Sequence, residues 1–309
     1  MKFPKLRSLA VLSPMSGVTD VAFRTLAARY GAGLTYTEFT NGTAVVRGYP
    51  FVLKRVATDP SEKPVAVQLF GNSVDDVVKA AKMVENQFDI IDVNCGCPAW
   101  KVIKTGSGSE LLKDPEKIAS FVNKLVSAVN KPVTVKIRIG IDDAQINAIE
   151  VAKLVENAGA AAIAVHGRTQ AQGYSGIANW DIIRQVKEHV NIPVIGNGDV
   201  FTPEQFKKRL DESGVDAIMI ARGAIGNPFI FKQINDYLAT GTYKKENRIE
   251  QFMEYVQLAQ KYRLNFDSLK TQAMSFTKGI IGGAKLRMKL ATSTSAEEIC
   301  TIINMQLLT

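Results

Sequence analysis

Eight short apolar runs, each followed by a polar or amphipathic stretch, constrain the fold of this chain more than any other feature. The runs are residues 9–12, 34–37, 65–69, 90–93, 133–137, 161–165, 193–196 and 217–220. Between the runs, apolar residues recur at spacings of three and four, as at Val77, Ala80 and Val84, which predicts amphipathic helices. Strands that alternate with helices in this way are parallel and joined by crossovers. Eight such units in about 240 residues predict an α/β fold, a closed (β/α)8 TIM barrel.

An open, doubly wound sheet is the alternative arrangement of the same elements. Such a sheet places Gly-x-Gly-x-x-Gly after its first strand. Here the first run is followed by Ser13-Pro14-Met15-Ser16-Gly17, which argues against this alternative. We expect the strands to be apolar on both faces, as buried parallel strands usually are.

The alternating pattern ends in a polar stretch at residues 240–245. Beyond it, Ile249, Phe252, Met253 and Val256 form one predicted helix face. We therefore expect a barrel over residues 1–243 and a small all-helical domain over residues 244–309. Residues 245–309 hold nine Lys or Arg against six Asp or Glu, within a chain of net charge +8. This balance favours a polyanionic partner, although basic enzymes need not bind nucleic acid.

Several classes of protein are disfavoured by composition. No run approaches the roughly 20 apolar residues of a membrane span, and the N-terminus lacks the apolar core of a signal peptide. Three cysteines do not form a disulfide framework, so we expect a cytoplasmic protein. We also expect no metal, because Cys95 and Cys97 would supply only two ligands and no second cluster completes a set.

Polar side chains follow nearly every predicted strand. In a barrel of this type the strand ends meet at one mouth, where the active site lies. Because each buried polar group costs stability unless it is used, their convergence predicts a binding site. The strand-end residues are Pro14, Met15, Ser16, Glu38, Gln68, Asn94, Cys97, Lys136, Arg138, His166, Asn197, Asp199 and Arg222.

Two glycine-containing loops, at residues 196–199 and 221–224, are suited to bind a phosphate. Gly198 and Gly223 would let backbone N–H groups approach an anion, and Arg222 adds a fork of donors. These loops follow the seventh and eighth strands, where barrels of this type commonly bind phosphate. A lysine directed into the mouth, Lys136, would also need an anionic partner.

Cys97 lies between Gly96 and Pro98, on a turn that ends a buried strand. A thiol presented in this way suggests a chemical role, and a turn cysteine without a role is the alternative. Of the two histidines, we assign a function to His166 at a strand end and none to His189, which lies late in a predicted helix.

The chain resembles the tRNA-dihydrouridine synthases. The resemblance covers the whole barrel and extends to the C-terminal helices by arrangement and length only. It rests on the segments 14–20, 92–98, 166–169, 196–199 and 222–228, and on Gln172, Tyr174, Gly176 and Trp180.

The resemblance implies an FMN-dependent barrel with a helical tRNA-binding domain. Such enzymes reduce the C5–C6 double bond of particular uridines in tRNA, with NADPH as the usual electron source. A hydride from reduced FMN would add to C6, and Cys97 would donate the proton to C5. A thiol with an ordinary pKa of about 8.5 is protonated at neutral pH and can serve as this acid. The stacked uridine would have to be extruded from the tRNA.

The same resemblance implies the other site residues by position. FMN contacts fall on Pro14, Met15, Ser16, Gln68, Lys136, His166, Asn197, Gly198, Asp199, Arg222 and Gly223. Substrate contacts fall on Asn94, Arg138, Gln172 and Tyr174.

This sequence departs from the family pattern at Ser16, Ala221 and Cys95. None removes a catalytic group, but Cys95 adds a second thiol beside the expected acid. Two alternatives stay open: an FMN-dependent barrel oxidoreductase acting on a free pyrimidine or other small molecule, and a non-catalytic RNA-binding barrel. We expect a monomer, and leave the target uridine, the choice of NADPH or NADH and the orientation of the tRNA open.

Overall fold

The computed structural model describes residues 1–307, and its centre is a parallel barrel. The nine strands have the order β1-β9-β8-β7-β6-β5-β4-β2, with β3 paired to β4. Backbone hydrogen bonds from Leu12 to Leu34 (2.9 Å) and from Gly33 to Ala10 (2.8 Å) join the two ends of this order and close the barrel. The strands are β1 (Ala10–Leu12), β2 (Thr35–Tyr36), β3 (Thr40–Asn41), β4 (Val65–Phe70), β5 (Ile90–Cys95), β6 (Val133–Arg138), β7 (Ala162–His166), β8 (Val194–Asn197) and β9 (Ala217–Ile220).

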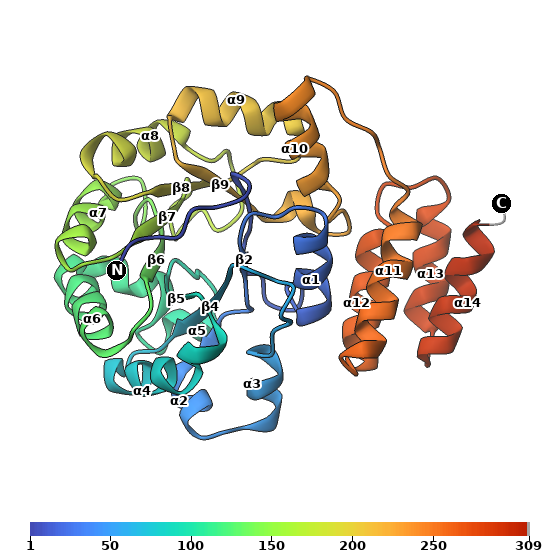
Figure 1. Cartoon of the computed structure of the whole chain (residues 1–309), viewed down its shortest axis with the longest axis horizontal. Helices are drawn as coiled ribbons and strands as arrows, with labels where there is room; N and C mark the ends of the chain where they lie inside the picture. The colour runs from blue at the N-terminus through green and yellow to red at the C-terminus, as the bar shows by residue number, and fades with distance from the viewer. Residues whose placement is uncertain (308–309) are drawn as a thin grey trace.

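Helices surround the barrel, as the sequence predicted (Figure 1). The predicted N-caps Asp114 and Thr202 accept hydrogen bonds from the third residues of α6 and α9. The second unit differs from a simple strand and helix, because β3, α2 and α3 all lie between β2 and β4. The helices of the barrel are α1 (Val21–Arg29), α2 (Gly42–Val46), α3 (Pro50–Arg55), α4 (Val74–Val84), α5 (Trp100–Ile103), α6 (Pro115–Ala128), α7 (Ala148–Asn157), α8 (Trp180–His189), α9 (Pro203–Ser213) and α10 (Ile230–Thr240), with short 3₁₀ turns at Glu85–Gln87, Gly108–Lys113 and Arg222–Ala224.

The inner face of β4, β5 and β6 is polar, so the expectation of strands apolar on both faces was wrong here. Gln68 pairs in register with Asp92, and Asp92 with Thr134. Residues in register on parallel strands project to the same face. The inner layer toward the N-terminal ends of the strands is apolar, and Ala66 and Ile90 are among its members. A polar layer therefore separates this apolar plug from the strand ends.

Four helices follow the barrel and pack against one of its sides (Figure 1). The predicted domain boundary at residues 243 and 244 falls in the coil between α10 and α11, and residues 308 and 309 lie outside the described part of the chain. The fold class predicted from the sequence, a TIM barrel followed by helices, is confirmed. The helices are α11 (Arg248–Lys261), α12 (Phe266–Phe276), α13 (Gly283–Thr292) and α14 (Ala296–Leu307).

Polar bonds and an aromatic cluster join the C-terminal helices to the barrel. Tyr255 of α11 donates to Asp20, which caps α1, and Gln272 of α12 donates to the Val18 carbonyl at 2.8 Å. Phe276 of α12 packs edge-on against Phe23 of α1. None of the helices in residues 1–307 is both long enough and apolar enough to cross a membrane.

Candidate active site

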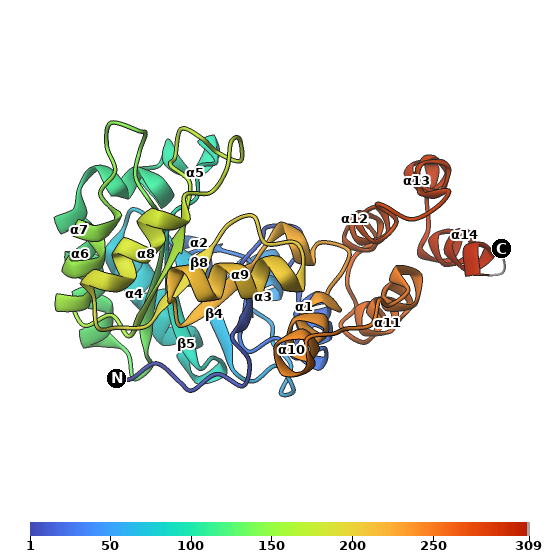
Figure 2. The same cartoon turned by 90° about the horizontal axis from the view of Figure 1, so that it is seen from above.

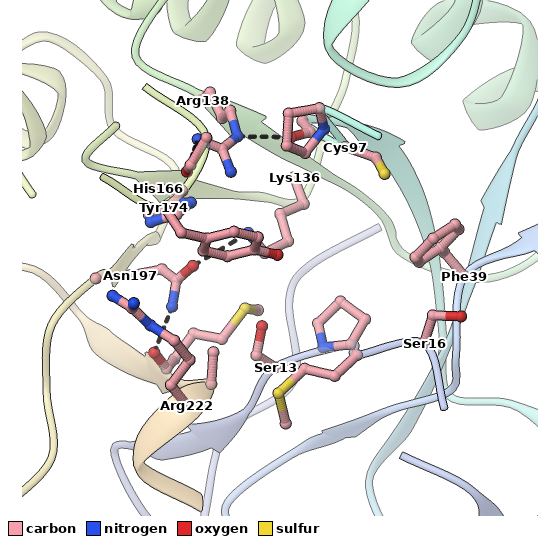
Figure 3. Close-up of a pocket in the computed structure, with 18 of the residues that line it drawn as sticks. Ser13, Ser16, Phe39, Cys97, Lys136, Arg138, His166, Tyr174, Asn197 and Arg222 are labelled. Atoms are coloured by element: carbon pink, nitrogen blue, oxygen red, sulfur yellow. Dashed lines mark hydrogen bonds between the residues drawn. The ribbon is translucent and has the colours of Figure 1, made fainter. Parts of the chain in front are cut away.

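A cavity of about 840 Å³ opens at the carboxyl ends of the strands (Figure 3). The structure brings together all but two of the residues that the sequence placed in the site. Glu38 and Gln172 do not line the cavity, and the side-chain oxygen of Gln172 accepts the Thr169 N–H at 2.8 Å. The predicted residues that line the cavity are Pro14, Met15, Ser16, Gln68, Asn94, Cys97, Lys136, Arg138, His166, Tyr174, Asn197, Gly198, Asp199, Arg222 and Gly223.

The two neighbouring cysteines face different surroundings. Cys97 lines the cavity, whereas Cys95 is fully buried in the layer between the barrel and its helices. Burial raises the pKa of the Cys97 thiol, against the opposing effect of a backbone N–H and of nearby cations. Cys97 is therefore a neutral thiol at physiological pH. Burial, followed by the charge of Asp92, raises the pKa of Cys95 as well.

Asn94 holds the turn that carries Cys97. Its side-chain oxygen accepts the backbone N–H groups of Gly96 (3.1 Å) and Cys97 (2.9 Å), and its amide nitrogen donates to Gln68 at 2.8 Å. These hydrogen bonds leave one side-chain N–H of Asn94 for a ligand. This amide thus makes most of its hydrogen bonds within the protein, which the sequence alone did not indicate.

A cationic cluster lies at the centre of the cavity. Lys136 donates to the side chain of Asn197 at 3.2 Å. Burial and the nearby Arg138 lower the pKa of Lys136 to about 8. Burial and the cations around it, Lys136 first, lower the pKa of His166 well below its usual range, so the ring is neutral. A neutral imidazole carries both a donor and an acceptor for a ligand.

Asp199 fixes the arginine expected to bind phosphate. Its carboxylate accepts from Arg222 at 2.6 Å and from Arg168 at 2.8 and 2.9 Å. Although burial opposes the shift, the bonds from Arg168 and from the Ala178 N–H lower the pKa of Asp199. The Arg222 guanidinium also lies over the Tyr174 ring, 5.6 Å from its centroid. Asp199 thus orients a guanidinium rather than facing a ligand with a free charge.

The two glycines of the predicted phosphate loops are required for packing. A Cβ at Gly223 would lie 2.4 Å from the Val200 carbonyl oxygen. A Cβ at Gly198 would lie 2.5 Å from that of Ala178, and its φ of +138° also favours glycine. The loop of Gly223 can approach Val200, and the loop of Gly198 can approach Ala178, only because both positions lack a side chain.

Arg138 binds a loop at the cavity rim. Its guanidinium donates to the carbonyls of Gly96 (2.9 Å), Thr169 (2.7 Å) and Gly173 (2.8 Å). Burial lowers the pKa of Arg138 to about 10, and it stays charged at neutral pH. Its neighbour Tyr174 is 64% exposed at the rim, and the Arg138 guanidinium carbon lies 5.7 Å from its ring centroid.

The family model described as "Dihydrouridine synthase (Dus)" matches residues 11–298. The chain belongs to the dihydrouridine synthase family. It is 38% identical to a probable tRNA-dihydrouridine synthase 1 of Synechocystis sp., over 95% of this chain and 84% of that protein. It is 45% identical to a probable tRNA-dihydrouridine synthase of Rickettsia conorii (82% and 77%) and 43% identical to tRNA-dihydrouridine synthase B of Pseudomonas putida (77% and 71%).

Solved structures of low identity share the fold of this dihydrouridine synthase family member. Histamine dehydrogenase from Rhizobium sp. 4-9 superposes with a TM-score of 0.59 at 15% identity, covering 82% of this chain and 49% of that one. A variant of NCR from Zymomonas mobilis gives a TM-score of 0.53 at 16% identity, covering 80% and 91%.

The sequence did not identify the aromatic and amide side chains that complete the cavity of this dihydrouridine synthase family member. Phe39 closes one side and Phe201 lies beneath the Arg222 guanidinium, 5.6 Å from it. Gln170 also lines the cavity. Their only sequence signal is their place within two residues of the end of a predicted strand or recognised motif. Conversely, Glu38 is used internally, since its carboxylate accepts the Gly17 N–H at 2.7 Å.

Proposed function

We propose that this chain reduces particular uridines of tRNA to dihydrouridine, using FMN and electrons from NADPH. The observation that carries the proposal is a neutral thiol, Cys97, at the edge of a cationic cavity in a member of the dihydrouridine synthase family. The tRNA substrate follows the printed names of the relatives, which are tRNA-dihydrouridine synthases. We place the reaction in the cytoplasm, where tRNA is processed, and expect a monomer.

The donor set of the cavity fits FMN, which carries a phosphate and gains negative charge on its ring when reduced. Lys136, Arg138 and Arg222 line the cavity, and Asp199, the one carboxylate among its lining residues in the described chain, is already paired with two arginines. The volume of about 840 Å³ lies in the range of cofactor sites. When bound, FMN would supply the hydride that saturates C6 of the uracil ring.

Different residues would bind the two ends of such a ligand. Arg222, held by Asp199, would bind the phosphate together with the loops of Gly198 and Gly223. Lys136 would offset negative charge near the ring, and Asn197 keeps its ammonium in place. We propose that the other predicted contacts, Pro14, Met15, Ser16, Gln68 and His166, complete the cofactor site.

Cys97 would act as the general acid. Its Sγ–H bond breaks as a C–H bond forms at C5 of the uracil ring, and the thiolate recovers a proton from solvent. Because burial raises the pKa of this thiol, it holds its proton until the carbon accepts it. The remaining N–H of Asn94 and the exposed ring of Tyr174 are the groups that we propose for the base, with Arg138 fixing the rim beside them.

The C-terminal helices would bind the tRNA backbone. Figure 2 shows α13 on the same side of the molecule as α5, which follows the Cys97 turn. Of the seven basic residues that we consider for phosphate contacts, Lys261, Lys270 and Arg287 already bond to acceptors in the protein. The other four are exposed and make no side-chain hydrogen bond or ion pair with residues 1–307: Arg263, Lys278, Lys285 and Lys289.

The proposal is tested by mapping dihydrouridine in tRNA by mass spectrometry, from cells with and without this chain. We expect one or a few uridine positions to lose the modification in its absence. Purified protein with FMN and NADPH should restore those positions and leave free uracil unreacted. Reduction of free uracil without reduction of tRNA would instead establish the small-molecule oxidoreductase. Protein that binds tRNA but retains no flavin would establish the non-catalytic alternative.

A further inference from the structure

A line of buried hydrogen bonds runs below the cavity, across three strands, to the Cys97 turn. Thr134 of β6 donates to one carboxylate oxygen of Asp92 on β5 at 2.5 Å. Gln68 of β4 donates to the other oxygen at 2.7 Å and accepts from Asn94 at 2.8 Å. Asn94 then accepts the turn N–H groups. Gln68 and Asp92 are fully buried, and neither Asp92 nor Thr134 lines the cavity.

The direction of the amide hydrogen bonds in this line is determined at the Cys97 turn. The backbone N–H groups of Gly96 and Cys97 can only donate, so Asn94 must turn its oxygen toward them. Its amide nitrogen then faces Gln68, which must present its own oxygen. The amide nitrogen of Gln68 in turn faces position 92 on β5, where an acceptor is required. The Asp92 carboxylate meets this requirement with one oxygen, and its other oxygen accepts from Thr134.

We propose that Asp92 is a positioning residue that, through Gln68 and Asn94, holds the Cys97 turn in its reactive arrangement. Without an acceptor at Asp92 the Gln68 amide can reverse. Two amide nitrogens would then face each other, and Asn94 would reverse too, leaving the N–H groups of Gly96 and Cys97 without their acceptor. The cost of unpaired buried groups would be relieved by opening the turn. Only the catalytic consequence of this opening rests on the proposed role of Cys97 as the acid.

The state of the turn can be measured without catalysis, from the rate at which iodoacetamide alkylates Cys97 in the full-length, flavin-loaded protein. Peptide mass spectrometry separates Cys97 from Cys300, a half-buried thiol on α14 that serves as an internal reference. We expect D92A to speed Cys97 alkylation about tenfold, the effect of losing one buried hydrogen bond to a charged group, while Cys300 is unchanged. An unchanged rate at Cys97 in folded D92A would overturn the proposal.

Isosteric variants separate hydrogen-bond direction from packing. D92N should behave like the wild type, because its oxygen can face Gln68 while its nitrogen donates to the Thr134 hydroxyl. Q68E places a second carboxylate against Asp92, and the repulsion should displace side chain 68 from Asn94 and speed alkylation as D92A does. The double variant D92N/Q68E restores a donor–acceptor pair with the two groups exchanged, and we expect the wild-type rate to return. A double variant as reactive as Q68E would show that direction is not what holds the turn.

Two further measurements test the proposal where D92A and Q68E do not fold and separate it from the role of Cys97 as the acid. If D92A and Q68E do not fold, T134V, which removes only one donor to Asp92, should still speed Cys97 alkylation by a smaller factor, and no change there would overturn the proposal. Dihydrouridine formation is measured in parallel. Alkylation that follows the predicted order, together with a C97A variant that still reduces tRNA, would leave the relay established and refute the role of Cys97 as the acid.

Discussion

Tyr255 of α11 donates a 3.0 Å hydrogen bond to the carboxylate of Asp20, the N-cap of α1. The other carboxylate oxygen of Asp20 accepts the Phe23 N–H at 2.9 Å. The Asp20 side chain therefore both caps the first helix of the barrel and binds a residue of the C-terminal helices. Burial raises the pKa of Asp20 to about 6, although both hydrogen bonds oppose the shift.

The raised pKa predicts how the stability of the protein depends on pH. Between pH 3.8, the ordinary value, and about 6, the folded state binds more protons at Asp20 than the unfolded state. The contribution of Asp20 to the free energy of unfolding is therefore largest below this window and falls as pH rises through it, by up to roughly 3 kcal/mol. Asp20→Asn keeps a helix cap and removes the titration. Urea unfolding from pH 4 to 8 should show the wild type losing stability relative to this variant.

Tyr255→Phe is the matched variant for this experiment. Because the lost hydrogen bond lowers the Asp20 pKa, its removal should move the titration to higher pH. A wild-type-minus-Asp20→Asn difference that stays constant from pH 4 to 8 would contradict the assignment of this titration to Asp20.

The barrel itself was predictable because strand and helix periods are local properties of the sequence. The runs at residues 65–69 and 90–93, for example, correspond to β4 and β5. The positions of the strand ends then followed from the fold, which is why nearly all the predicted site residues line one cavity.

Hydrogen-bond partners were not predictable in this way, because they depend on register between strands. Gln68 meets Asp92 only through the pairing of β4 with β5, and nothing in either segment records it. The same limit explains why the sequence did not show that Asn94 also holds the turn of Cys97. It also explains why the hydrogen bond of 2.7 Å from Lys261 to Asp59 was not predicted, since Asp59 lies about 200 positions earlier in the chain.

Arg222→Ala should weaken FMN retention by roughly 10- to 100-fold, the effect of removing a charged hydrogen-bond partner from a phosphate. The fold should persist, because Arg168 still pairs with Asp199. Quenching of flavin fluorescence on titration with protein measures the affinity. Arg184→Ala, on the exposed surface of α8, is the matched control and should bind FMN as the wild type does. Equal affinity in Arg222→Ala would remove the phosphate from this position.

The exposed basic residues of the C-terminal helices should determine the salt dependence of tRNA binding. We expect alanine at Arg263, Lys278, Lys285 and Lys289 to weaken binding and to reduce the slope of log K against log salt by up to about 3–4. Filter binding at several salt concentrations measures both quantities.

A control variant removes the same charge from another part of the molecule. Its four alanines replace lysines that are ion-paired on α8, α9 and α10: Lys187, Lys207, Lys208 and Lys232. An equal loss of affinity in both variants would mean that net charge, and not the C-terminal surface, attracts the tRNA.

The different surroundings of Cys95 and Cys97 lead to the most direct test of the mechanism. Cys97→Ala should bind FMN and accept electrons from NADPH at the wild-type rate, because neither step uses the thiol. Flavin reoxidation by tRNA should then slow by about 10²–10⁴-fold, the usual cost of losing a general acid. Cys95→Ala should reoxidise at nearly the wild-type rate, since its side chain faces the helices and not the cavity. Stopped-flow absorbance follows both half-reactions in each variant, and a block confined to Cys95→Ala would show that the other thiol is the acid.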